Sequence, residues 1–114
     1  MQVLASHSIP AESWQVAAMV KKQILFADTS ASVILFGSRA RGDAGDDSDW
    51  DFLVLTKRTD TVLLWDELRK TILKEVELKY NVAISLIVKN ATLWESDYSV
   101  TNIYESISEE GVML

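Results

Sequence analysis

The chain has 114 residues, 48% of them hydrophobic, which is enough for one compact core and too few for two. We therefore expect a single domain over residues 1–114. The 17 acidic and 11 basic residues give a net charge of −6. This charge opposes binding to long DNA or RNA, because that binding depends on basic surfaces that release counterions.

The sequence has no cysteine, no leader-peptide pattern and no apolar run close to the roughly 18 residues that a membrane helix needs. These features predict a cytoplasmic protein with no membrane segment. Absence of cysteine is only weak support for the compartment.

The first half of the chain predicts one helix and two strands. The helix begins near residue 10, where a capping residue, a proline and an acid occur together, and it continues to about Asp28; the three residues are Ser8, Pro10 and Glu12. Residues 33–36 and 52–55 are short apolar runs that predict buried strands. The polar segment 38–48 between them predicts a loop with a short helical turn.

The second half predicts a long helix, a third strand and one or two short helices. Residues 61–80 carry apolar side chains at helical spacing, and the predicted buried face comprises Trp65, Leu68, Ile72 and Val76. Asn81 is a plausible stop. Residues 82–88 predict a strand with Ile84 and Leu86 on one face and Ser85 on the other. The fold class is therefore α+β.

A glycine and a serine follow the first strand directly. Gly37 allows the backbone to turn sharply and approach a ligand, while Ser38 offers a hydroxyl and an N–H group. Arg39 and Arg41 place two guanidinium groups nearby, and each can bind phosphate in a forked geometry. An ordinary strand-to-helix loop with solvated arginines explains this segment about equally well when it is taken alone.

Two aspartates stand at the head of the second strand. Asp49 and Asp51 are two residues apart, so their side chains share one face while Trp50 faces the other. Two adjacent carboxylates repel each other unless a proton or a cation lies between them, and Mg²⁺ is the usual cation. When the two aspartates are considered alone, a solvated pair at a strand end is the simpler explanation. Their occurrence in one strand–loop–strand unit with Gly37-Ser38 favours a metal and phosphate site.

The combination of Gly-Ser, Arg-Gly and Ser-Asp-x-Asp resembles the nucleotidyltransferase superfamily, whose fold is shared with DNA polymerase β and kanamycin nucleotidyltransferase. In particular, the chain is similar to the minimal nucleotidyltransferases, and the diagnostic stretch runs from about Val33 to Leu55. The resemblance implies a nucleotidyltransferase-type mixed β-sheet with helices packed on it.

The resemblance also implies roles for individual residues. Asp49 and Asp51 would be catalytic and would hold one or two Mg²⁺ ions. The implied nucleotide-binding residues are Gly37, Ser38, Arg39, Arg41 and Ser48. The implied reaction transfers a nucleoside monophosphate, most simply AMP, from a nucleoside triphosphate to an acceptor hydroxyl, with pyrophosphate leaving.

Active relatives usually add a third carboxylate on a later strand. The segment 81–90, where that strand falls, has no Asp or Glu, and Ser85 occupies the equivalent position. The nearest acids in sequence are Glu77, Glu95 and Asp97, and nothing in the sequence places them at the site. This departure leaves nucleotide and metal binding plausible and puts transfer in question.

Two classes of function therefore stay open. The first is the transferase, whose acceptor would be a partner protein: the resembling family is often paired with a helical HEPN-type partner as antitoxin and toxin. The second is a catalytically degenerate relative that senses nucleotide or binds a partner. A homodimer is also reasonable, because four tryptophans on a small core leave apolar surface to cover.

Overall fold

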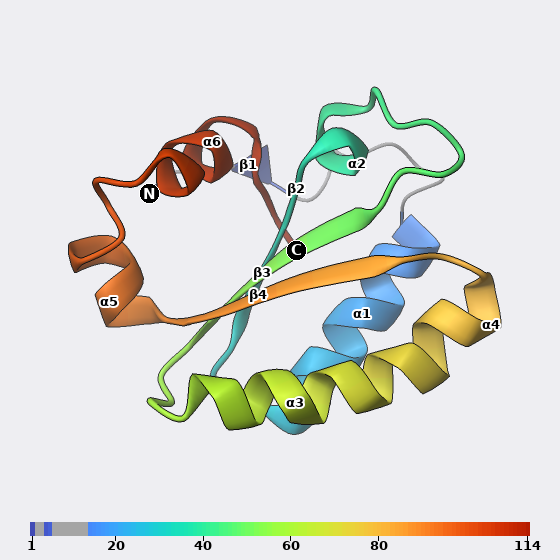
Figure 1. Cartoon of the computed structure of the whole chain (residues 1–114), viewed down its shortest axis with the longest axis horizontal. Helices are drawn as coiled ribbons and strands as arrows, with labels where there is room; N and C mark the ends of the chain where they lie inside the picture. The colour runs from blue at the N-terminus through green and yellow to red at the C-terminus, as the bar shows by residue number, and fades with distance from the viewer. Residues whose placement is uncertain (2–3, 6–13) are drawn as a thin grey trace.

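The computed structural model describes residues 1, 4–5 and 14–114 and contains a mixed five-stranded sheet with helices on both faces (Figure 1). The strand order is β1-β5-β2-β3-β4. The α+β class and the mixed sheet predicted from the sequence are confirmed. Among the described residues, no helix is long and apolar enough to cross a membrane.

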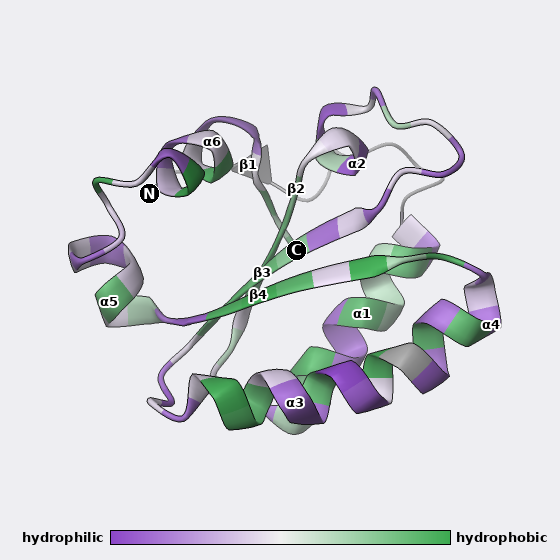
Figure 2. Cartoon of the chain, viewed as in Figure 1, coloured by the Kyte–Doolittle hydropathy of each residue, from purple (hydrophilic) through white to green (hydrophobic). Residues whose placement is uncertain are grey.

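Three strands predicted from the sequence form the half of the sheet that carries the site. They are β2 (Ser32–Phe36), β3 (Trp50–Thr56) and β4 (Ile84–Asn90). β2 and β3 are antiparallel, with Phe36 opposite Asp51, whereas β3 and β4 are parallel. Figure 2 shows these strands hydrophobic along most of their length and β3 hydrophilic where it begins.

One face of the sheet is covered by α1 (Trp14–Ala27) and by a long helix (Figure 1). That helix begins as α3 (Thr61–Ile72), passes through a π-helical turn (Leu73–Glu77) and ends as α4 (Leu78–Tyr80). Asn81 then takes a left-handed conformation with φ of 53°, as its predicted role as a stop requires. The predicted start of the first helix near residue 10 lies outside the described residues.

The phase of the long helix differs from the prediction at one position. Leu64, rather than Trp65, occupies the first buried position of the face that continues through Leu68 and Ile72. Trp65 is 42% exposed and donates a hydrogen bond from its indole Nε1 to the carbonyl of Leu86 on edge strand β4. Leu64 is entirely apolar and fits the core, whereas Trp65 keeps its N–H at the border, where it finds an acceptor.

The other face is covered by α5 (Ala91–Ser96) and α6 (Asn102–Glu110), which pack Trp94 and Ile107 against the sheet. After α6 the chain adds the short strand β5 (Val112–Met113) antiparallel to β2, and β1 (Leu4–Ala5) pairs with β5. The sequence did not predict β5, because a two-residue strand has no readable period. Its position matters, since it brings the end of α6 beside β2.

Candidate nucleotide and metal site

The end of β2 and the beginning of β3 meet at Gly37 and Asp51. Gly37 has φ of 76° and ψ of −161°, a region of backbone conformation that is essentially restricted to glycine. A Cβ at this position would overlap the Asp51 carboxylate, whose Cγ would lie 3.3 Å away. Glycine is therefore required here both for the turn and for the approach of Asp51.

Directly after Gly37 the chain forms the short helix α2 (Ser38–Arg41), which is the helical turn predicted from the sequence. The carbonyl of Gly37 accepts from the N–H groups of Ala40 and Arg41, so the turn is held by its own backbone. The first N–H groups of a helix have no partner within it. The N–H and hydroxyl groups of Ser38 thus lie at the opening of a turn beside a carboxylate.

The two aspartates carry unfavourable mutual charge. Burial raises the pKa of Asp51 above its ordinary value, the nearby charges of Asp49 and Glu110 raise it further, and Arg41 opposes the shift. Asp49 is exposed, whereas Asp51 is half-buried on the face of β3 opposite to the buried Trp50. The pair therefore concentrates negative charge where a cation would relieve it.

Arg39 and Ser48 organise the loop that carries Asp49. The guanidinium of Arg39 lies 4.6 Å from the centre of the Trp50 ring and donates to the carbonyl of Ser48 at 3.1 Å. The hydroxyl of Ser48 accepts from the N–H of Gly45 at 2.9 Å. Both residues were predicted to bind nucleotide; in this structure their side chains hold the loop, and their contact with phosphate stays a prediction.

Arg41 is tied to a residue that the sequence did not single out. Its Nη1 donates to Glu110 Oε2 at 2.7 Å and its Nε to Asp43 Oδ2 at 3.1 Å, and these bonds raise the pKa of the guanidinium. The other carboxylate oxygen of Glu110 accepts from the N–H of Gly37 at 3.1 Å. No local pattern in the sequence links Glu110 to a turn 73 residues away.

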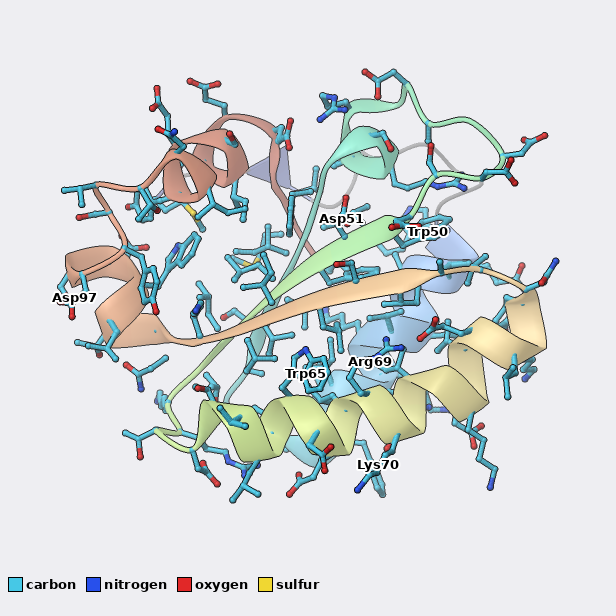
Figure 3. All side chains as sticks on the ribbon, viewed as in Figure 1. Trp50, Asp51, Trp65, Arg69, Lys70 and Asp97 are labelled. Carbon is cyan, nitrogen blue, oxygen red and sulfur yellow. The ribbon has the colours of Figure 1, made fainter. Side chains whose placement is uncertain are left out.

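Ser85, which stands where a third carboxylate was expected, is paired with Asp51 in the register of β3 and β4. The other acids considered from the sequence have different partners. Glu77 pairs with Arg69 at 2.7 Å, and Glu95 accepts from the hydroxyl of Tyr104 at 2.6 Å. Asp97 directly follows α5 and lies at the left of Figure 3, away from Asp51.

Comparison with known proteins agrees with this geometry. The sequence profile of the nucleotidyltransferase domain matches residues 18–112. The chain belongs to the nucleotidyltransferase domain family. Members of this family generally use a divalent metal ion and take a nucleoside triphosphate as substrate.

Two similar proteins narrow the comparison. A Methanocaldococcus jannaschii protein named "Putative protein adenylyltransferase" is 40% identical over 75 residues, which cover 64% of this chain and 75% of that protein. A solved structure titled "Structure of putative minimal nucleotidyltransferase" is 23% identical and superposes with a TM-score of 0.58 over 88% of this chain and 93% of that one. The structural likeness shows the shared nucleotidyltransferase fold.

The carboxylates of this nucleotidyltransferase fit a divalent ion whose remaining ligands come from the substrate and from water. Within residues 1, 4–5 and 14–114, no group of three or more metal-ligating side chains is assembled. Mg²⁺ commonly binds through only one or two carboxylates, with water and phosphate oxygens completing its six ligands. Asp49 and Asp51 can supply that share. Burial and the charges of Asp49 and Glu110 raise the pKa of Asp51, and a bound cation would offset that repulsion.

The candidate site rests on the chemistry of its residues and does not coincide with either of two surface hollows. A hollow of about 320 Å³ lies between α3 and β4 and is lined by residues that include Trp65 and Lys89. A second hollow is lined by α1 residues, among them Phe26. Neither contains Gly37, Asp49 or Asp51, and neither brings together groups suited to a phosphate or a metal.

Proposed function

We propose that this nucleotidyltransferase binds a Mg²⁺–nucleoside triphosphate and transfers AMP to an acceptor hydroxyl on a partner protein. The observation that carries the proposal is the meeting of the Gly37-Ser38 turn with Asp49 and Asp51 in the family's fold. The choice of AMP and of a protein acceptor is supported by the similar archaeal protein, whose name describes it as a protein adenylyltransferase.

The reaction is a displacement at the α-phosphorus. The acceptor oxygen forms a bond to phosphorus, the bond to the bridging oxygen of pyrophosphate breaks, and the hydroxyl proton passes to a carboxylate or to water. When bound, Mg²⁺ neutralises charge on the phosphates and polarises their oxygens. Asp49 and Asp51 hold the ion, and Gly37 and Ser38 contact the phosphates and fix their orientation.

A second candidate is a degenerate nucleotidyltransferase that binds nucleotide or partner without turnover. The observation in its favour is Ser85, which faces Asp51 where active relatives carry a carboxylate. Serine is neither a strong ligand for Mg²⁺ nor a base near neutral pH. This candidate retains the nucleotide site and differs only in the transfer step.

The decisive experiment is calorimetric titration with ATP and with GTP, with and without Mg²⁺, on the wild type and on Asp49→Asn/Asp51→Asn. We expect Mg²⁺-dependent binding that weakens about 100-fold or more in the double variant, because both metal ligands lose their charge. The matched control is Asp46→Asn/Asp47→Asn, which removes two exposed acids from the same loop.

Each outcome has a clear meaning. Binding lost in the Asp49/Asp51 variant and kept in the Asp46/Asp47 variant supports the site. Absence of binding by the wild type to either nucleotide contradicts the proposal. Transfer is then tested with labelled ATP and a native extract: a labelled protein and released pyrophosphate support the transferase, whereas binding without label favours the degenerate candidate.

A further inference from the structure

Glu110 connects the two ends of the turn that opens the nucleotide site. One carboxylate oxygen accepts from the backbone N–H of Gly37, where the turn begins. The other accepts from Arg41, the last residue of α2, at 2.7 Å. The Glu110 side chain thus contacts both ends of the segment from Gly37 to Arg41, and it is 21% exposed.

The place of Glu110 is set by the packing of the next residue. A Cβ on Gly111 would lie 2.5 Å from the Ile107 carbonyl and 2.9 Å from Ile34 Cγ2, so only glycine lets α6 end this close to β2. Val112 then pairs with Leu35, two residues before Gly37. These contacts fix the backbone on both sides of the Glu110 side chain and bring it to the turn.

We infer that Glu110 is a positioning residue for nucleotide binding, which sets the orientation of the Gly37-Ser38 peptide by accepting from the Gly37 N–H. The inference rests on the proposed function and names a residue that acts through others. Gly37 has a backbone conformation restricted to glycine, and the helix α2 that follows it is only four residues long. A tether at each end reduces the freedom that phosphate binding would otherwise have to remove.

Glu110 could affect nucleotide binding through its negative charge as well as by orienting the Gly37-Ser38 peptide. Its carboxylate lies against the Gly37 N–H and Arg41, so it adds negative charge next to the place proposed for the triphosphate. Removing that charge alone favours binding of a polyanion. Its removal also lessens the attraction for Mg²⁺, so a variant that removes only the charge is needed to separate lost orientation from changed charge.

The test compares three substitutions at this position. Glu110→Gln removes the charge and keeps an acceptor for the Gly37 N–H, whereas Glu110→Ala and Glu110→Met remove both; Met also keeps the volume in case Ala does not fold. The control is Glu109→Ala, an exposed neighbour on the same helix. The measurements are the Kd for Mg²⁺–ATP by calorimetry, the midpoint of thermal unfolding and the Gly37 amide signal by NMR, which is readily assigned among four glycines.

We expect Glu110→Ala and Glu110→Met to weaken ATP binding about tenfold and to shift the Gly37 signal, with Glu110→Gln within about threefold of the wild type. Equal affinity in all variants overturns the inference while leaving the proposed function intact. Equal weakening in Gln, Ala and Met also overturns it, because the acceptor then has no role. If the wild type binds no nucleotide, the proposed function fails and this inference fails with it.

Discussion

The two flanks of Asp51 differ in charge and in how they are held. On the β2 flank lie Gly37 and Glu110, which are joined by a hydrogen bond and fixed by the end of α6. On the β4 flank lies Ser85, exposed and paired with Asp51 only through the strand register. Under the proposed function, we expect the β2 flank to hold the ligand in one orientation, whereas on the β4 flank Ser85 is exposed and carries no charge. We expect the acceptor to approach from the β4 flank.

The largest expected effect comes from breaking the β2 flank at Gly37. Gly37→Ala places a Cβ in the Asp51 carboxylate and forces alanine into a glycine-only conformation, which costs roughly 1–3 kcal/mol of unfolding free energy from strain alone. We expect Mg²⁺-dependent ATP binding to be lost in calorimetry. Gly45→Ala is the control, because its Cβ would meet only Ser48 Oγ at 4.0 Å. Retained ATP binding in Gly37→Ala would contradict the proposed contact between this turn and phosphate.

A smaller effect, an increase in the rate of transfer, is expected when the β4 flank is given a carboxylate like that of the β2 flank. Ser85→Asp supplies a carboxylate beside Asp51. This carboxylate can help hold Mg²⁺ and can take the proton from the attacking hydroxyl group. We expect transfer measured by pyrophosphate release to rise by about tenfold or more. Ser85→Asn is the control for size and polarity. An unchanged rate in Ser85→Asp, with nucleotide binding intact, would show that the missing carboxylate does not limit the reaction.

The charge difference between the flanks also has a consequence for stability. Asp51 is half-buried near Asp49 and Glu110, so its ionised form is disfavoured in the folded chain. We expect Asp51→Asn, in the presence of a chelator at pH 7, to raise the midpoint of thermal unfolding by on the order of 1–3 °C while it abolishes metal-dependent binding. A lower midpoint would mean that Asp51 makes stabilising contacts in the free protein that outweigh this repulsion.

The smallest effect is expected at the other end of β3, where an aspartate is stabilised. Burial raises the pKa of Asp28, but hydrogen bonds from Thr56 and Ser30 outweigh it, and the net pKa lies below the ordinary value. An acid whose pKa is lowered by folding contributes stability above its unfolded pKa and loses it as the pH falls through its folded pKa. Asp28→Asn should therefore lower the unfolding midpoint slightly at pH 7. The difference should begin to shrink as the pH falls below about 4 and should vanish below the folded pKa of Asp28. A difference that is constant with pH would assign the effect to packing.

Local patterns predicted much of the fold and of the site. The alternation in residues 82–88 gave the correct faces of β4, with Ile84 and Leu86 buried and Ser85 on the opposite face. The spacing of Asp49 and Asp51 gave their orientation away from the buried Trp50. Gly37 followed from its place after an apolar strand. In each case the decisive interaction lies within a few residues of the pattern that predicts it.

What the sequence did not predict depends on contacts between distant segments. Glu110 reaches Gly37 only because β5 pairs with β2 and Gly111 permits a close approach, and a two-residue strand leaves no period to detect. Trp65 was assigned to the buried face from its helical spacing with Leu68 and Ile72, yet Leu64 fills that position. Arg39 was assigned to phosphate because of its charge, while the ring of Trp50 and the loop carbonyls engage it in the free chain.

The hydrogen bond between Gly37 and Glu110 also bears on the order in which the protein is made. The two residues are 73 positions apart, so a ribosome that adds 5–20 residues per second needs about 4–15 seconds to travel from one to the other. During that interval the turn and both aspartates have emerged without their tether and without β5. We therefore expect a nascent chain to bind nucleotide less tightly until α6 and β5 have docked, which ties full affinity for the ligand to a late step of folding.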